Sequence, residues 1–271
     1  MCGRYVIMNK LKIIAETFNA DASEIMERFQ INPNVSPGDE ALVITDEDPQ
    51  KLQLFTFGFT PFWAKKRMYV INARSEGDHN KENDPGYRGA KGIIKKPMWR
   101  KSIRSRRCLV IADAFVEGTE KERLSKPYLV YRVNNKRPFA MAGIWDEWVN
   151  KDTGEVVRSF AIITTAPAPL LQLIPHHRSP LILSQDDERL WLDKNLPLSA
   201  ITELMEPFDD EEFNAYPISP DIKSSKNKDS EVLKPLDKWI RPEVKYVWQE
   251  SIELQGMGET TARKRKLNEE H

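Results

Sequence analysis

The sequence predicts an α+β fold, with one β-centred domain and helices at its periphery. Short β-rich segments separated by turn residues recur through the middle of the chain, as expected for a β core. Apolar residues at helical spacing lie toward the two ends of that region. The length of 271 residues and the hydrophobic fraction of 40% allow a core of this size.

Four short helices are expected on this reading. Helical spacing of apolar residues marks residues 11–19 and 22–29 near the start of the chain. Two more are predicted at residues 186–195 and 198–206, each with an Asp or Ser near its beginning, as is typical of helix starts.

The predicted strands are short apolar runs bounded by Gly, Pro, Asn or Asp. They cover residues 41–46, 52–57, 68–76, 108–115, 127–133, 138–148 and 156–165. Residues 77–90 are rich in Gly, Asn, Asp and Lys and predict an exposed insertion. With no internal repeat and no clear linker, we expect one domain over residues 2–240 and a polar, flexible C-terminal tail over residues 241–271.

The charge distribution indicates how the protein could bind a nucleic acid. The 41 basic and 41 acidic residues give zero net charge, which excludes a uniformly basic nucleic-acid coat. Residues 91–107 nevertheless hold eight Lys or Arg and no acid, whereas acids concentrate at residues 184–189 and 206–213. This asymmetry predicts a basic face.

The remaining composition favours a cytoplasmic protein. Cys2 and Cys108 are the two cysteines, too few for a disulfide framework, and this usage is typical of a reducing compartment. The sequence has no run of 18 apolar residues and no signal-peptide core, so we expect neither export nor a membrane partner.

Cys2 directly follows the initiator methionine, whose removal would leave a terminal cysteine. The amine of such a residue has a pKa of roughly 7.7–8.0 and its thiol a pKa of about 8.5, so both react near neutrality. The pair suits aldehyde capture, because the amine forms a Schiff base and the thiolate closes a five-membered thiazolidine. The alternative is a small apolar side chain near a frayed terminus.

Asn72, Arg74 and Glu76 follow an apolar run in "INARSE". In a strand these three side chains share one face, so an amide and a guanidinium could point into one cleft. The alternative is an ordinary strand end that faces water.

Glu117 ends another apolar run, where Phe115 and Val116 would desolvate it and raise its pKa for acid–base work. His176 and His177 lie in the apolar segment "IPHHRSPLIL", where a histidine can move a proton near neutral pH. Without a Cys, His or carboxylate cluster at ligand spacing, we expect no metal and no other cofactor. A surface turn glutamate and structural histidines are the alternatives.

The order of these motifs is more specific than any one of them. "MCGR" at residues 1–4, "NARSE", "RCLVIADAFVE" and "HHRSP" closely resemble the SRAP family, named for SOS-response-associated peptidase and comprising abasic-site processing proteins. "NVSP" and "GFTPFWA" also resemble segments of that family. The resemblance extends from Met1 to about Pro235.

The resemblance implies a β-barrel-like core with flanking helices and a positively charged groove for single-stranded DNA. It also implies a covalent thiazolidine between Cys2 and the aldehyde of a ring-opened abasic site. Asn72 would orient the amine and the sugar, Glu117 would act as acid and base, and His176 would assist sugar opening. Thr164 is the matching threonine, with Thr165 as the alternative because the spacing to the histidine is one residue longer than expected.

The resemblance also implies a set of DNA-binding residues: Arg4, Asn34, Ser36, Pro37, Phe57, Trp63 and Arg74. Arg4 and Arg74 would hold phosphates beside the lesion. Phe57 replaces a common Trp and would stack on a base or sugar with less area. Gly118 replaces another common Trp, and Ser179 stands where Met or Arg is usual. We therefore expect the contacts with DNA to differ from those of other members.

We therefore expect a monomer that binds single-stranded DNA containing abasic sites and protects the lesion through a covalent adduct. Such a protein would associate with the nucleoid when bound to DNA. Self-removal of Met1 would be a side activity and the origin of the peptidase label. Two alternatives remain open: a cysteine peptidase or amidase, and a non-covalent reader of modified bases in DNA.

Overall fold

The computed structural model describes residues 3–133 and 138–242. Its core is a five-stranded barrel, which closes because the first and last of these five strands pair directly. The barrel order is β10–β4–β3–β6–β9, and β9 returns to β10. These strands are β3 (Glu40–Thr45), β4 (Gln53–Phe57), β6 (Arg107–Ala112), β9 (Phe139–Val149) and β10 (Val156–Thr165). The predicted α+β class with a barrel core is confirmed.

Two short strands extend the barrel at the C-terminal end of β10. β5 (Asn72–Arg74) runs parallel to β10, and β11 (Ser179–Pro180) runs antiparallel to it. Thr164 of β10 is opposite Arg74 on one side and Pro180 on the other. Segments separated by about a hundred residues in the sequence therefore meet at one end of β10.

The second sheet has five strands in the order β12–β8–β7–β1–β2. They are β1 (Arg4–Ile7), β2 (Asn32–Val35), β7 (Ala114–Thr119), β8 (Arg123–Arg132) and β12 (Phe213–Pro217). All pairs within this sheet are antiparallel.

Asp113 joins the two sheets. The single strand predicted at residues 108–115 is divided there into β6 of the barrel and β7 of the second sheet. The buried Asp113 carboxylate accepts hydrogen bonds from the backbone of Met8 and Asn9, at 2.5 and 2.8 Å. Its own backbone N–H donates to Val6 O at 2.8 Å. These bonds stabilise the change of sheet, which a continuous apolar run does not reveal.

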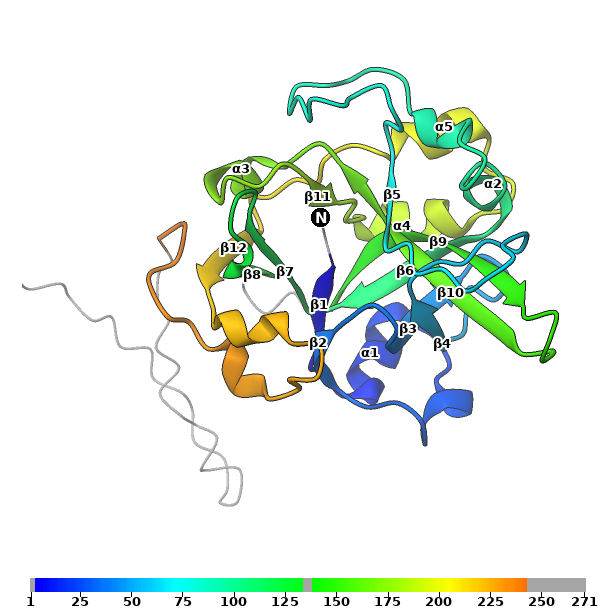
Figure 1. Ribbon diagram of the computed structural model, residues 1–271, viewed down its shortest axis with the longest axis horizontal. Coiled ribbons are helices and arrows are strands. Elements are labelled where there is room, and N and C mark those ends of the chain that lie inside the picture. The colour runs from blue at the N-terminus through cyan, green and yellow to red at the C-terminus, as the bar shows by residue number, and fades with distance from the viewer. Residues whose placement is uncertain (1–2, 134–137, 243–271) are drawn as a thin grey trace, which may run out of the picture. The chain divides into compact units, whose positions relative to one another are not determined.

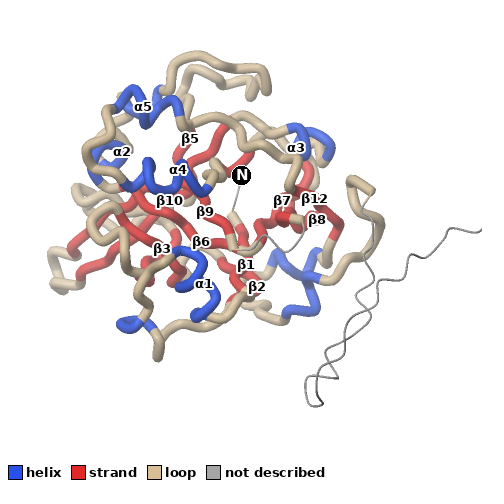
Figure 2. Tube along the Cα trace, turned by 180° about the vertical axis from the view of Figure 1, so that it is seen from behind, coloured by secondary structure: helices blue, strands red, loops and turns tan. Residues whose placement is uncertain are grey.

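The helices are short and lie around the sheets (Figure 2). They are α1 (Leu11–Phe18), α2 (Ser102–Ser105), α3 (Pro169–Leu173), α4 (Gln185–Leu192) and α5 (Leu198–Glu203), with 3₁₀ turns η1 (Ser23–Ile25), η2 (Gly92–Ile94), η3 (Pro220–Lys223) and η4 (Ser230–Leu233). No helix in the described ranges combines the length and apolarity that crossing a bilayer requires.

Three of the four predicted helices are present, and the one at residues 22–29 is wrong. Only η1 forms there. Asp21 accepts hydrogen bonds from the backbone and the hydroxyl of Ser23, which favours a turn. Met26 is exposed, and although Phe29 packs against the core, the residues between Ile25 and Phe29 form turns and no regular helix. The expected tail beyond Pro242 lies outside the described residues.

Candidate functional site

Glu117 and His176 form a buried pair at the end of β7. Their side chains are 4% and 5% exposed, and His176 Nε2 lies 3.2 Å from Glu117 Oε2. The other ring nitrogen of His176 is 2.7 Å from the carbonyl oxygen of Gly118, to which Nδ1–H donates. That bond places the proton of the neutral ring on Nδ1 and leaves Nε2 as an acceptor toward Glu117.

Burial shifts both groups away from their charged forms. It raises the pKa of Glu117 to about 7 and lowers the pKa of His176 to about 4. Between these values the carboxyl group holds a proton and the imidazole is neutral. The expected desolvation of Glu117 is thus present, and Phe115 and Val116 are themselves fully buried beside it.

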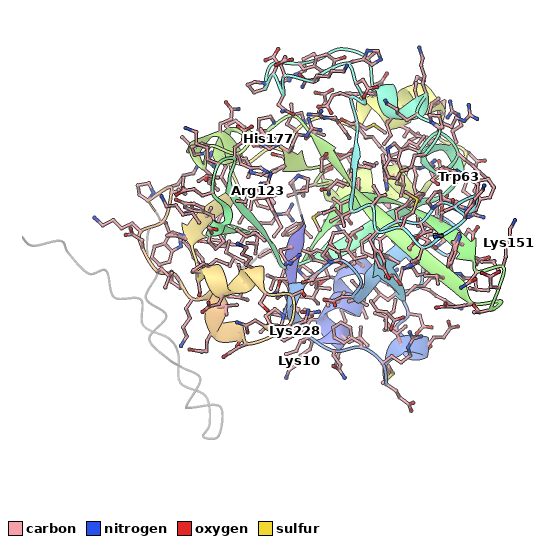
Figure 3. All side chains as sticks on the ribbon, in the orientation of Figure 1. Lys10, Trp63, Arg123, Lys151, His177 and Lys228 are labelled. Carbon is pink, nitrogen blue, oxygen red and sulfur yellow. The ribbon has the colours of Figure 1, made fainter. Side chains whose placement is uncertain are left out.

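Gly118 is required by the backbone next to this pair. The pairing of β7 with β8 shifts register between Gly118 and Thr119, and a Cβ added at Gly118 would lie 1.7 Å from Arg123 O. No larger residue fits while the bulge keeps this shape, so the absence of the common Trp has a local cause. Figure 3 shows Arg123 and His177 in the same part of the molecule, with Trp63 on the other side of β5 in that view.

The start of the chain runs toward Glu117. β1 pairs antiparallel with β7, and Arg4 lies opposite Val116, the residue before Glu117. Going backward along β1 toward Gly3 therefore leads toward the Glu117 end of β7. The Arg4 guanidinium donates to Lys223 O at 3.3 Å and to Gly3 O at 2.8 Å. Cys2, the expected nucleophile, lies outside the described residues.

Asn72 and Arg74 lie on β5 and line one cleft, as their strand spacing predicts. Ala73 between them is fully buried on the opposite face. The cleft has a volume of about 480 Å³, and its other lining residues are Trp63, Gly77, Asp78, Lys96, Pro97, Met98 and Trp99. The indole of Trp63 is half exposed.

A buried ion pair joins the segment that follows β5 to the segment that precedes β11. Arg178 Nη1 and Nη2 donate to the Glu76 carboxylate at 3.1 and 2.7 Å, and both side chains are 2% exposed. Burial opposes the charged form of Glu76, but the hydrogen bonds and charge of Arg178 outweigh it and lower the pKa. Arg178 Nη2 also donates to Thr164, to O at 2.8 Å and to Oγ1 at 3.3 Å. The Thr165 hydroxyl instead donates to Ala166 O.

Glu76 is expected to share a strand face with Asn72 and Arg74, but β5 ends at Arg74 and Glu76 instead pairs with Arg178, for which the sequence predicts no role. Glu76 and Arg178 each belong to one of the quoted motifs, "NARSE" and "HHRSP". The sequence holds one signal for this pair: the two residues have opposite charges and each lies beside an apolar run. Buried charges are normally paired, so such residues are candidates for an ion pair.

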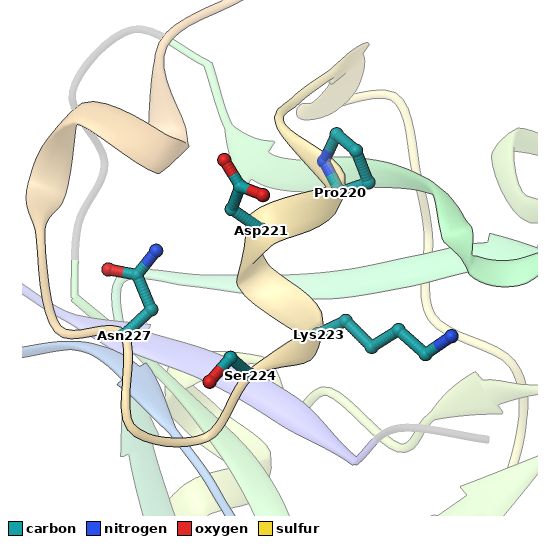
Figure 4. Close-up of a pocket in the computed structure, with 5 residues that line it drawn as sticks. All are labelled: Pro220, Asp221, Lys223, Ser224 and Asn227. Atoms are coloured by element: carbon teal, nitrogen blue, oxygen red, sulfur yellow. The ribbon is translucent and has the colours of Figure 1, made fainter.

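Asn34 and Ser36 differ from the expectation that they bind DNA. Both are fully buried. Asn34 Nδ2 donates to three carbonyls of residues 222–227 at 2.9–3.1 Å, and the Ser36 hydroxyl donates to Asn34 O at 3.0 Å. They anchor a loop beside a surface hollow of about 510 Å³, lined by Pro220, Asp221, Lys223, Ser224 and Asn227 (Figure 4). Pro37, the third member of that motif, is exposed.

Phe57 is also a core residue and not a DNA contact in this structure. Its ring is fully buried, stacked on Phe160 with centroids 5.3 Å apart and edge-on to Tyr5 at 5.5 Å. Its expected role in stacking on a base or sugar is therefore corrected: the ring packs in the core against Phe160 and Tyr5.

The basic run at residues 91–107 is only partly available to an anion. Arg107 is fully buried and donates to backbone carbonyls, among them Trp191 O at 2.7 Å. Arg106 is paired with Asp146, and Lys91 Nζ lies 2.7 Å from Glu206 Oε1. The exposed cations of the run are Lys95, Arg100, Lys101 and Arg104.

Comparison with known proteins identifies the family. A family model described as SOS response associated peptidase (SRAP) matches residues 1–225. The abasic site processing protein YoqW of Bacillus subtilis (strain 168) is 30% identical over 238 residues, covering 86% of this chain and 99% of that protein. The abasic site processing protein HMCES of Gallus gallus is 28% identical over 225 residues, covering 74% of this chain and 62% of that protein.

A solved structure supports the same assignment. The crystal structure of a Bacteroides thetaiotaomicron protein matches with a TM-score of 0.72 and 28% identity, covering 86% of this chain and 99% of that one. With the family model matching most of the chain and the motifs of "NARSE" and "HHRSP" meeting at one site, the chain belongs to the SRAP family, whose relatives here are named abasic site processing proteins.

Proposed function

We propose that this protein binds single-stranded DNA and captures abasic sites as a covalent thiazolidine adduct at Cys2. The observation that carries the proposal is the buried pair of Glu117 and His176, placed where β7 runs beside the start of β1. We expect Cys2 to lie near this pair, because it is bonded to Gly3 and β1 leads from Arg4 toward Glu117. The names of the relatives support an abasic site as the substrate.

The first step opens the sugar. An abasic deoxyribose is mostly a closed ring with a hydroxyl group on C1′. Neutral His176 Nε2 takes the hydroxyl proton as the bond from C1′ to the ring oxygen breaks, and then donates that proton to the ring oxygen, which returns His176 to its neutral form. The product is a free aldehyde at C1′.

The second step forms two bonds at C1′. The Cys2 amine adds to the aldehyde, and Glu117 donates a proton to the hydroxyl group, which leaves as water and gives the Schiff base. The Cys2 sulfur then adds to the same carbon, and its proton returns to the Glu117 carboxylate. One water is released in total, and both catalytic groups end in their starting forms.

Binding makes this condensation fast by holding the reactants together, since effective molarities of oriented groups reach about 10⁵–10⁸ M. Asn72 and Arg74 in the cleft would hold the sugar and a phosphate, and Trp63 would stack on a base. Exposed cations such as Lys95 and Lys101 would add affinity that falls steeply with salt.

The amine of Cys2 must be free, so Met1 has to be removed. In an N-terminal methionine form that nitrogen belongs to an amide and cannot condense. Removal by the protein itself or by an aminopeptidase would serve equally. Mass measurement of the purified protein, with and without exposure to an aminopeptidase, shows which form is present and whether only the trimmed form reacts.

The deciding experiment incubates the protein with single-stranded DNA that contains one abasic site and resolves the products by denaturing gel. We expect a denaturant-stable adduct for the wild type and for Cys108→Ala, whose thiol is fully buried. Cys2→Ala should give none, and neither should an intact strand. An equal yield from Cys2→Ala would show that the chemistry runs through another residue. A duplex with the same lesion tests the preference for single strands.

A further inference from the structure

A long loop lies beside the cleft that contains Asn72 and Arg74. We call residues 78–91 the strap; in Figure 1 it is the teal loop at the top of the molecule, between β5 and α2 along the chain. Its two ends meet at a narrow neck. Ile93 N donates to Ser75 O at 3.0 Å, and a Cβ added at Gly92 would lie 2.5 Å from Glu76 O. Gly77 has a φ of +59°, which favours glycine at the turn into the strap.

The strap supplies acceptor oxygens to two cations of the cleft. Asp78 forms an ion pair with Lys96, and Asn83 Oδ1 accepts a hydrogen bond from Arg74 Nη2. Asp78, Lys96 and Arg74 all line the cleft of about 480 Å³. A phosphodiester also offers oxygen acceptors to Lys and Arg, so a DNA strand and the strap would use the same donors.

The shape of the strap is fixed by its own hydrogen bonds. Asn80 Nδ2 donates to Asp84 O at 3.1 Å, and Asp84 N donates to Asn80 Oδ1 at 2.8 Å. Asn83 lies between them with a φ of +57°, a conformation that Asn tolerates better than most residues. The side chain of Asn83 is therefore held toward Arg74 by an ordered turn.

The end of the strap is tied to another part of the molecule. Lys91 Nζ lies 2.7 Å from Glu206 Oε1, and Arg88 Nε lies 3.6 Å from Glu206 Oε2. The segment with Asp78 and Asn83 contacts the cleft, and the segment with Arg88 and Lys91 contacts the region after α5. Movement of the first segment can therefore leave the second in place.

We propose that the strap is a built-in competitor for the DNA backbone, and that single-stranded DNA must displace Asp78 from Lys96 and Asn83 from Arg74 to bind fully. This inference rests on the proposed DNA binding. It adds that the strap lowers the affinity for any DNA strand, because phosphate oxygens must replace the oxygens of Asp78 and Asn83 as partners of Lys96 and Arg74. The residues that set its strength are Asp78 and Asn83.

The experiment measures binding of an intact oligothymidine of 15 nucleotides, by fluorescence anisotropy, at several salt concentrations. Asp78→Asn removes the competing carboxylate and should tighten binding about two- to fivefold, the range expected for a partly exposed ion pair. Glu82→Gln is the matched control, because it removes the same charge from the exposed part of the strap. Asn83→Asp should weaken binding by a similar factor, because the acceptor for Arg74 becomes charged.

Salt dependence gives a second readout. In the wild type, Lys96 leaves Asp78 as it takes a phosphate, and the freed carboxylate recruits a cation from solution. Asp78→Asn lacks this uptake, so its plot of log affinity against log salt should be steeper by about 0.7, the value for one phosphate of a single strand. The slope of Glu82→Gln should match that of the wild type.

Hydrogen exchange tests displacement directly. The amide of His79 donates to Glu76 O at the neck, and the amide of Asn83 donates to Asn80 O within the strap. They should exchange faster when the oligonucleotide is bound. Equal affinities and slopes for Asp78→Asn and Glu82→Gln, or slower exchange of the strap on binding, would overturn the strap proposal while DNA binding stands. If the wild type and all variants fail to bind the strand, the proposed function and the strap proposal both fall.

Discussion

Glu117 and His176 share one proton in a buried site, and the carboxyl group holds it. An ionised glutamate beside a protonated histidine contains the same number of protons as a neutral glutamic acid beside a neutral histidine. Burial favours the neutral pair because both charged forms lose hydration. Burial is the largest cause of both the raised pKa of Glu117 and the lowered pKa of His176. The site thus holds a proton donor and a proton acceptor side by side.

The first prediction concerns the pH dependence of adduct formation. As pH rises, the Cys2 amine loses its proton and becomes nucleophilic, while Glu117 loses the proton it donates, with a pKa of about 7. The wild-type rate should therefore rise and then stop rising or fall above about pH 7. Glu117→Gln should react about 10²–10⁴-fold more slowly and follow only the rising limb.

Single-turnover rates between pH 5 and 9, from quenched samples on a denaturing gel, measure this profile. Glu120→Gln is the matched control, since Glu120 lies on the same turn with a side chain 64% exposed. A wild-type rate for Glu117→Gln, or an unchanged profile, would contradict the assignment of Glu117 as the acid.

Among the elements, the bulge between β7 and β8 shapes the site most directly. Gly118 contributes only backbone, yet its carbonyl accepts the Nδ1–H of His176 and fixes the tautomer. A strand without the bulge would direct this carbonyl elsewhere. The position of a backbone oxygen therefore determines which nitrogen of His176 faces Glu117.

The second prediction tests the bulge through Gly118→Ala. The new Cβ would lie 1.7 Å from the backbone oxygen of Arg123, which cannot move independently of β8. We expect a loss of about 1–3 kcal/mol in the free energy of unfolding and slower adduct formation, because the acceptor of His176 moves. Urea unfolding and the gel assay measure the two effects.

Gly154→Ala separates backbone strain from this steric effect. Gly154 has a φ of +75° and no atom within 4 Å of an added Cβ. Its variant should lose about 1–2 kcal/mol from strain alone and keep the wild-type rate. Equal rates for both alanine variants would show that the Gly118 carbonyl does not position His176.

The sequence predicts most elements because their apolar patterns are local. β3, β4, β8, β9 and β10 form within residues that alternate or run apolar between turn residues. The break at Asp113 could not be predicted, because the apolar run continues across it and only the pairing with β1 and β9 differs. The pairing of Glu76 with Arg178 likewise depends on contacts between distant segments.

At Phe57 the family resemblance predicts a DNA contact, whereas the neighbouring residues predict a core position. Phe55 and Phe57 are two residues apart on β4, so they share a face, and both are buried. That spacing predicts a core ring. The resemblance to a family pattern suggested DNA contact at this position, but a pattern of residue types does not state which side of a strand faces solvent.

At the scale of the whole molecule, the site lies where the barrel and the second sheet meet. β7 and β1 of the second sheet supply Glu117 and the start of the chain, while β5 supplies Asn72 and Arg74 from the edge of the barrel. The polypeptide passes from barrel to second sheet at Asp113. Packing in the barrel and chemistry at the site are thus separable, because the strands that close the barrel are not those that carry Glu117, Asn72 and Arg74.

The third prediction uses two aromatic residues to test that separation. Phe57→Ala removes a ring that packs on Phe160 and Tyr5, so the free energy of unfolding should fall by about 3–5 kcal/mol. Trp63→Ala removes a half-exposed ring from the cleft, so stability should change by less than about 0.5 kcal/mol. Affinity for single-stranded DNA should instead fall by about 1–3 kcal/mol, the range for one stacked base.

Urea unfolding and titration with an intact oligonucleotide, both on the same preparations, measure these effects. DNA affinity of Phe57→Ala should be determined at low urea, where the fraction of folded protein is known from the unfolding curve, and should equal that of the wild type. Phe57→Leu keeps most of the apolar volume and serves as the milder variant if the alanine form does not fold. A variant of Phe57 that keeps its stability but loses DNA affinity would mean that this ring contacts DNA and does not pack against Phe160 and Tyr5 in the core.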